Sequence, residues 1–219
     1  MELLEGEELE KFLAQWESFE AKKAEVINEA FQREIVTGDD IKSVLLTYSD
    51  SNNRWELFAN LAENGKLSDE AFNVGLAIAW VEGKGTGDYR AISYFMKCKK
   101  EIIMDEKELV YYDSLPDKVT LYRGCSMEEY EDDAFGISWT TNREVAEFFA
   151  FRCEQEGTAV YSMEVDKNDI RAVFLSRNEF EAIYLDSYEV TLVTDKPTEL
   201  YNNYMIKKRQ QDKLRIGIK

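Results

Sequence analysis

Residues 119–124, Val-Thr-Leu-Tyr-Arg-Gly, mark the point at which the character of this chain changes. The residues before the glycine are rich in β-branched and aromatic side chains, which favours a strand, and Gly124 is expected to end it. The two prolines of the chain, Pro116 and Pro197, bracket the segment that begins here. Apolar residues recur at helical spacing before Pro116 and in short strand-like runs after it.

The segment after Pro116 is predicted to be rich in strands. Thr141-Asn142-Arg143-Glu144 has the pattern of a capping box, which predicts a helix from there to about Gln155, ended by Gly157. We therefore expect one clear helix among short strands. Besides the first strand and residues 137–141, strands are expected at residues 159–165, 172–175, 180–185 and 188–193.

The chain before Pro116 is predicted to be helical. Leu9, Phe12, Leu13, Trp16 and Phe19 follow a spacing of three and four residues, which gives one apolar helical face. Further helices are expected at about 40–48, 53–64, 69–81 and 88–103. The domain organisation is thus a helical region over 1–115, a compact core over 116–196 and a basic tail over 197–219, in the α+β class.

The composition excludes several classes of enzyme. No histidine occurs among the 219 residues, which excludes Ser-His-Asp and Cys-His hydrolases, histidine-ligated zinc enzymes and two-histidine iron sites. Cys98, Cys125 and Cys153 are far apart and form no Cys-x-x-Cys pair, so reduced thiols fit better than a disulfide framework or a zinc site. We assign no metal-ligating residue.

The charge and hydropathy of the chain limit which partners and which cellular location can be expected. A formal net charge of −17 repels phosphate backbones over any broad surface, which disfavours stable binding to duplex DNA or RNA. Cationic protein partners are the more natural expectation, and simple solubility is the alternative reading of the same charge. No run of about 18 apolar residues and no signal-peptide pattern is present. We expect a cytoplasmic protein without membrane contact.

Two of the strand-like segments carry polar side chains suited to a nucleotide. Arg123 precedes Gly124 at the end of the first expected strand. An arginine presents a fixed fork of donors suited to phosphate, and a glycine lets a ligand approach the backbone. In the next strand, alternation puts Ser138 and Thr140 on one face and Trp139 on the other. Hydroxyl groups in such a row can hold a carboxylate or a ribose.

A pair of glutamates opens a third strand-like segment. Glu179 and Glu181 are two residues apart, so on a strand they point to the same side, about 7 Å apart along the chain. Two ionised carboxylates at that spacing repel each other. The pair is therefore poorly placed beside an apolar strand unless it has partners or a function.

In this order the three motifs resemble the arginine–serine–glutamate class of mono-ADP-ribosyltransferases, over roughly residues 119–195. That class has an arginine on its first core strand, a Ser-Thr-Ser-like strand and a Glu-x-Glu entering a later strand. The matching residues here are 121–124 (Leu-Tyr-Arg-Gly), 138–140 (Ser-Trp-Thr) and 179–181 (Glu-Phe-Glu). The likeness is to the short bacterial and phage-type forms, and it implies a compact split β-sandwich. A sister class needs a His-Tyr-Glu set, which a chain without histidine lacks.

The resemblance implies that NAD is a substrate, cleaved at its nicotinamide–ribose bond, and that ADP-ribose passes to a target. It implies that Glu181 stabilises the oxocarbenium-like state, that Glu179 faces the incoming nucleophile, and that Ser138 positions Glu181 and the ribose. The residues that it assigns to NAD binding are Tyr122, Arg123, Gly124, Ser138 and Thr140.

In this family, enzymes with a glutamate at the position of Glu179 use arginine as the acceptor. The resemblance therefore implies a target protein that is modified on arginine side chains. The chemistry agrees, because a guanidinium is a poor nucleophile that needs an adjacent carboxylate to orient it and accept its proton. The loop over 174–178 is then expected to contact the target, with Arg177 and Asn178 as first contacts.

Two other functions stay open. A nucleic acid could be the acceptor, since the last fifteen residues carry six bases against one acid, although the overall charge disfavours it. The chain could instead be an inactive acidic protein that mimics a ligand of a basic surface. The helical region over 1–115 could cover the NAD cleft, recognise a target or dock a neutralising partner. A toxin, a phage effector and a defence protein are all compatible with these features.

Overall fold

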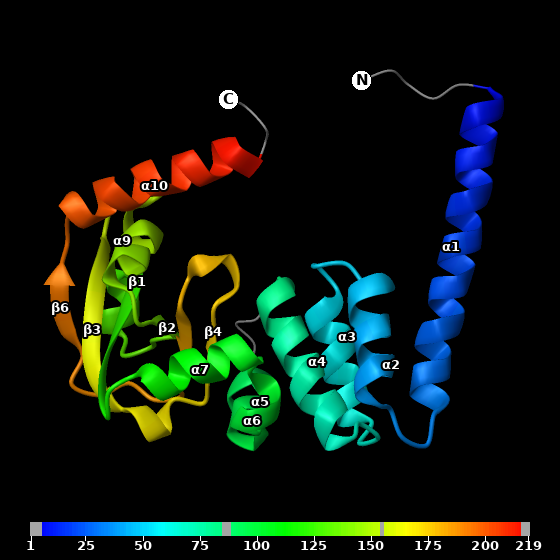
Figure 1. Cartoon of the computed structure of the whole chain (residues 1–219), viewed down its shortest axis with the longest axis horizontal. Coiled ribbons are helices and arrows are strands. Elements are labelled where there is room, and N and C mark those ends of the chain that lie inside the picture. Colours follow the sequence, from blue (N-terminus) through cyan, green and yellow to red (C-terminus); the bar gives the residue numbers. More distant parts are fainter. Residues whose placement is uncertain (1–5, 85–88, 154–155, 216–219) are drawn as a thin grey trace. The chain divides into compact units, whose positions relative to one another are not determined.

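The computed structural model describes residues 6–84, 89–153 and 156–215, without the side chains of 211–215. The chain divides into two compact units, one that ends at Asp88 and one that begins at Tyr89. The first is helical and the second combines one sheet with several helices, so the fold is α+β, as predicted (Figure 1). Within the described ranges no helix combines the length and apolarity needed to span a membrane.

The helical unit has a core of large apolar side chains. Ile41, Leu45, Phe58 and Leu76 are fully buried in it, which removes their apolar surface from water. Ser68 caps the last helix of the unit, as expected, by accepting a hydrogen bond from Ala71 N at 3.1 Å. The elements are α1 (Glu7–Gln32), α2 (Gly38–Lys42), a π-helical turn η1 (Ser43–Thr47), α3 (Arg54–Glu63) and α4 (Asp69–Glu82).

Helix α1 confirms the helix expected at the start of the chain, but its apolar face is exposed. Phe12 and Trp16 are 48% and 55% exposed, and their rings stack with centroids 6.5 Å apart. Ala30 is the buried residue of this helix. The N-terminal half of α1 therefore contributes little to the core of its unit.

The second unit is built on a six-stranded sheet with the strand order β4-β5-β2-β1-β3-β6. All of its strand pairs are antiparallel. Strands β1 and β3 pair along their full lengths, whereas the register of β1 with β2 consists of the single pair Tyr122–Thr140. The strands are β1 (Lys118–Ser126), β2 (Ser138–Thr140), β3 (Thr158–Asp166), β4 (Ala172–Phe174), β5 (Glu181–Ile183) and β6 (Thr191–Thr194).

Helices flank this sheet. Helix α9 lies against β1 and β3, and α10 packs on α9 (Figure 1). Besides α9 (Arg143–Phe151) and α10 (Glu199–Arg215), the unit contains α5 (Arg90–Lys97), α6 (Lys100–Ile103), α7 (Glu106–Ser114), α8 (Met127–Glu131) and the 3₁₀ turns η2 (Lys167–Asp169) and η3 (Ser176–Asn178).

The unit with the sheet begins earlier in the chain than residue 116, which corrects the expected boundary. Arg171 donates hydrogen bonds to the carbonyl oxygens of Phe95 and Met96, at 3.0 and 2.9 Å. The ring of Phe95 packs against Phe174 of β4, with centroids 6.5 Å apart. Helices α5 to α7 therefore belong with the sheet, since their polar and apolar contacts are made there.

The expectation of one clear helix among the strands also needs correction. The described strands form one hydrogen-bonded sheet, and α8 and α10 accompany α9. Residues 199–215, expected in a tail, form helix α10. Its first turn is fixed because Thr198 donates from its hydroxyl and its backbone N to Glu147, at 2.7 and 3.2 Å. Glu147 is fully buried, and an unpaired carboxylate there would be costly.

The start of α9 differs by one residue from the predicted cap. Asn142 is the N-cap, and its Oδ1 accepts from Glu144 N at 2.9 Å. The Thr141 hydroxyl lies instead 2.6 Å from the hydroxyl of Tyr111 on α7. The predicted helix end at Gln155 lies outside the described residues, and the described helix ends at Phe151.

Candidate active site

The predicted site residues lie on or beside three adjacent strands, β5, β2 and β1. Thr140 is opposite Glu181 across β2 and β5, and opposite Tyr122 across β2 and β1. Since directly opposed residues share a face of a sheet and alternate residues return to it, Ser138 and Glu181 lie on one face. Pairing between β1 and β2 ends beside Arg123.

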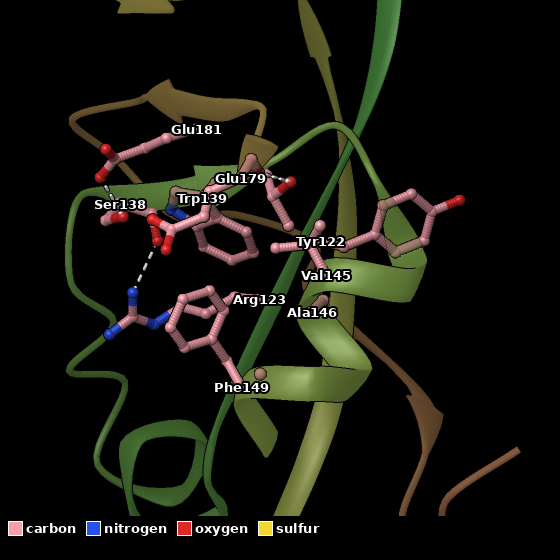
Figure 2. Close-up of a pocket in the computed structure, with 11 residues that line it drawn as sticks. Tyr122, Arg123, Ser138, Trp139, Val145, Ala146, Phe149, Glu179 and Glu181 are labelled. Carbon is pink, nitrogen blue, oxygen red and sulfur yellow. Dashed lines mark hydrogen bonds between the residues drawn. The ribbon is translucent and has the colours of Figure 1, made fainter. Parts of the chain in front are cut away.

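The side chains of these strands surround one pocket of about 220 Å³, shown in Figure 2. The volume is below the roughly 300–1,000 Å³ of pockets that enclose drug-sized ligands, so it can enclose one end of a dinucleotide. All of the predicted site residues line it. The full lining is Tyr122, Arg123, Gly124, Ser138, Trp139, Thr140, Val145, Ala146, Phe149, Glu179 and Glu181.

A short hydrogen bond joins two of the predicted catalytic residues. Ser138 Oγ donates to Glu181 Oε1 over 2.5 Å (Figure 2). A hydroxyl that donates to an ionised carboxylate makes one of the stronger hydrogen bonds in proteins. The bond fixes the rotamer of Glu181, whose carboxylate is partly exposed at the pocket.

Arg123 lies in the pocket wall and is tied to both of its neighbours there. Its Nη1 donates to the backbone oxygen of Ser138 at 2.6 Å, and its Nε and Nη2 donate to Glu129 Oε2 at 2.9 and 2.8 Å. The structure thus brings Arg123, Ser138 and Glu181 together. Three of the five guanidinium N–H donors are used by these bonds within the described residues.

Gly136 makes room for this arginine. A Cβ at Gly136 would lie 2.8 Å from Arg123 Nη2 and 3.3 Å from its Cζ. Neither Gly136 nor Glu129 was expected at the site. Glu129 stands in the acid-rich run of residues 128–133, and nothing in the sequence distinguishes it from its neighbours.

Thr140 lines the pocket, and its hydroxyl bonds to two backbone groups. Its hydroxyl donates to the backbone oxygen of Glu179 at 2.7 Å and accepts from Asn142 N at 3.0 Å. The residue is buried. The hydroxyl therefore positions the loop that carries Glu179 and the start of α9.

Gly124 lines the pocket and also allows a close packing contact. A Cβ there would collide with the backbone oxygen of Ala146 and would lie 2.6 Å from Ala150 N, both in α9. A glycine is needed here because α9 crosses β1 at close range. Tyr122 lines the pocket and packs against the cluster formed by Ala146, Ala150, Phe151 and Val160.

The loop before β5 is held in an uncommon backbone conformation. Arg177, Asn178 and Phe180 have φ angles of 61°, 56° and 49°, in the left-handed region that non-glycine residues rarely adopt. Two carbonyl oxygens of the loop are anchored, Glu179 O by Thr140 and Phe180 O by Thr141 N at 3.1 Å. These anchors set the carboxylate of Glu179 at the pocket.

Helix α9 supplies the apolar wall of the pocket through Val145, Ala146 and Phe149. Of the two adjacent phenylalanines, Phe149 lines the pocket, and Phe148 packs on Tyr204 of α10 with ring centroids 5.3 Å apart. The choice between the two rings depends on where α10 lies.

Trp139 points away from the hydroxyls of its strand, as the alternation predicted. Its side chain is 2% exposed, and its ring lies 5.6 Å from that of Phe135. Cys125 is also buried beside the site, and burial raises the pKa of its thiol to about 12, with the nearby Glu129 adding to the rise. Cys125 is therefore protonated at neutral pH and is not a nucleophile.

Among the described residues, no three His, Cys, Asp or Glu side chains are grouped in a way that could hold a metal ion. Comparison of the chain with protein-family models, with curated proteins and with solved structures finds no match.

Proposed function

We propose that the pocket binds the nicotinamide–ribose end of NAD, and that the protein is a mono-ADP-ribosyltransferase that modifies arginine side chains of a target protein. The observation that carries the proposal is the Ser138–Glu181 hydrogen bond of 2.5 Å in a pocket also lined by Arg123 and Glu179. Three motifs that resemble this class in sequence thereby meet around one cavity of suitable size.

The sheet lends further support. Strands β4-β5-β2 and β1-β3-β6 meet through the single pair Tyr122–Thr140. We propose that these two groups of strands correspond to the two halves of a split sandwich, with Arg123 beside the junction. The motif residues then belong to both halves, as the proposed site requires.

The proposed reaction breaks the bond between the ribose C1 and the nicotinamide nitrogen. Nicotinamide leaves with the bonding electron pair, and positive charge develops on C1 and the ring oxygen, as in glycoside cleavage. The carboxylate of Glu181 stabilises that charge more than it stabilises intact NAD. Because Ser138 already fixes the carboxylate, little reorganisation is needed when the bond breaks.

In the same step, Arg123 binds NAD and Glu179 binds the acceptor. The N–H donors of Arg123 that are not used by Glu129 and Ser138 can bind the pyrophosphate oxygens of NAD. Glu179, which also lines the pocket, orients an acceptor guanidinium toward C1 and accepts its proton. Phe149 closes the apolar side, where a nicotinamide ring can stack.

The test is release of nicotinamide from NAD by the purified full chain. We expect Glu181→Gln to lower the rate by roughly 100-fold or more, the magnitude typical of losing an electrostatic contact made in the transition state. Glu164→Gln, at an exposed position of β3, is the matched control and should retain the wild-type rate. Thermal unfolding of both variants checks the fold. Wild-type release by Glu181→Gln would refute the proposal.

The acceptor is tested with agmatine, a small molecule that carries a guanidinium. Glu179→Gln should reduce ADP-ribose transfer to agmatine at least tenfold more than it reduces NAD hydrolysis, because water needs no carboxylate to orient it in the same way. An equal loss of both reactions would assign Glu179 to NAD cleavage rather than to the acceptor.

A nucleic-acid acceptor is the second candidate, favoured by one observation. A second pocket of about 270 Å³ adjoins the Glu179 loop at Asn178 and Phe180, and Lys207 and Lys208 of α10 also line it. Lysine ammonium groups suit phosphate, although Lys207 is paired with Glu144 at 3.1 Å. Labelled NAD added to a cell lysate, followed by protease or nuclease, distinguishes the two acceptors by which treatment removes the label.

A further inference from the structure

The loop that carries Glu179 also carries an arginine of its own. Arg177 Nη2 lies 3.3 Å from Glu179 Oε2. The Arg177 side chain is 58% exposed and that of Glu179 is 23% exposed. A guanidinium of this chain thus already contacts the carboxylate to which the proposed function assigns the acceptor.

The contact depends on a backbone conformation that the sequence does not favour. Arg177 and Asn178 both have positive φ, which costs on the order of 1 kcal/mol or more for a non-glycine residue and persists where the surroundings impose it. Here the bonds from Thr140 and Thr141 hold the following residues. The chain therefore turns back at Arg177, and its side chain comes to lie against Glu179.

An exposed ion pair of this kind contributes little to stability, since pairs in solvent are worth about 0–1 kcal/mol. Stability alone therefore gives a weak reason for a strained loop that brings these two side chains together. A guanidinium held beside the acceptor carboxylate has a high effective concentration, because transfer to it is intramolecular.

We infer, on the basis of the proposed function, that Arg177 is a site of self-modification, ADP-ribosylated in cis by its own chain. The ribose C1–nicotinamide bond of NAD breaks, and nicotinamide leaves with the electron pair. A guanidinium nitrogen of Arg177 forms the new bond to C1. One N–H proton passes to Glu179 and then to water, so the modified guanidinium keeps a single positive charge.

The test follows two products in one reaction. The full-length protein is incubated with NAD, nicotinamide is measured, and peptides are mapped by tandem mass spectrometry for an added ADP-ribose. Arg177→Lys keeps the positive charge but removes the guanidinium, and Arg209→Lys, an exposed residue of α10, is the matched control. We expect the adduct on the Arg177 peptide of the wild type and of Arg209→Lys, and at least a tenfold smaller total adduct in Arg177→Lys.

The two readouts distinguish failure of this inference from failure of the proposed function, and a dilution series and a mixing experiment then test the cis route. Nicotinamide release without an adduct at Arg177 would overturn this inference and leave the proposed function standing. No nicotinamide release from any chain would overturn both. For the cis route, the fraction modified per minute should not change over a 100-fold dilution of protein, and a Glu181→Gln chain mixed with wild type should stay unmodified. Adduct on the Glu181→Gln chain would overturn the cis route.

Discussion

The hydroxyl of Thr140 donates a hydrogen bond to the backbone oxygen of Glu179 over 2.7 Å. Strand β2 thereby sets the position of the loop that leads into β5, in addition to pairing with β5 itself. Ser138, on the same strand, holds the side chain of Glu181. The two glutamates of the Glu-Phe-Glu motif are thus positioned by two hydroxyls of one strand, one through the backbone and one through the carboxylate.

Replacing Thr140 with valine keeps the side-chain shape and removes its hydroxyl. The carbonyl oxygen of Glu179 and the Asn142 N–H would each lose their partner, at a cost of roughly 1–3 kcal/mol for an unsatisfied buried group. We expect melting to occur several degrees lower and transfer to agmatine to fall more than NAD hydrolysis. Thr120→Val, at an exposed position of β1, is the control. Unchanged transfer in Thr140→Val would show that Glu179 needs no such anchor.

A methyl group at Gly124 should destabilise the second unit. The added Cβ would meet backbone atoms of Ala146 and Ala150, and backbone in a packed helix cannot move away at low cost, so we expect a loss of about 1–3 kcal/mol or more. Urea unfolding of Gly124→Ala, compared with the wild type at equal m-value, measures it. Wild-type stability would mean that α9 can shift away from β1 freely.

Gly136→Ala, unlike Gly124→Ala, should leave stability unchanged and weaken NAD binding. The nearest atoms to its added Cβ are the end of the Arg123 side chain, with Nη2 at 2.8 Å. A guanidinium can move by a few tenths of an ångström, so we expect stability close to that of the wild type. The KM for NAD should rise about tenfold, since a displacement of the guanidinium weakens the contacts of Arg123 to phosphate, at 1.4 kcal/mol per decade. An unchanged KM would show that Arg123 does not contribute to NAD binding.

The three cysteines should differ sharply in reactivity. Cys153 is exposed, whereas Cys98 and Cys125 are buried. With burial raising the pKa of Cys125 to about 12, only about one thiol in a thousand is ionised at pH 9. We expect a maleimide to label Cys153 alone in the native protein from pH 7 to 9, and all three residues in denaturant. Native labelling of Cys125 as fast as Cys153 would contradict the packing around Arg123.

Much of the local structure could be predicted because it depends on neighbours in sequence. Apolar spacing located α1, α3 and α4 to within a few residues, and Ser68 was identified as a cap from its own chemistry. The strand containing Ser138 and Thr140 could be oriented by alternation alone, which put Trp139 in the core. Such features need no knowledge of distant contacts.

Features that depend on distant contacts were missed. Helices α5 to α7 look like a continuation of the helical region. Contacts distant in sequence assign them to the sheet, such as the bonds from Arg171 to Phe95 and Met96 and the bond from Leu175 N to Glu108. Residues 199–215 look like a basic tail, and the buried carboxylate of Glu147 that receives Thr198 is 51 residues away in sequence. The contact of Glu129 with Arg123 was not expected, because the sequence does not show which side chains lie beside this arginine.

By itself, the sequence determined which side chains are present for chemistry and in what order they occur. It contains no histidine, and alternation correctly put Trp139 in the core. The predicted strand end at Gly124 was wrong, because β1 continues to Ser126, and Glu179 lies in the loop before β5. Only the tertiary structure decided that the predicted site residues meet in one pocket, that Arg123 is held by Glu129, and that Arg177 turns back onto Glu179. The reason is physical: residue type and spacing set local conformation, whereas a site requires side chains distant in the chain to come within hydrogen-bonding distance, and packing of the whole unit determines those distances.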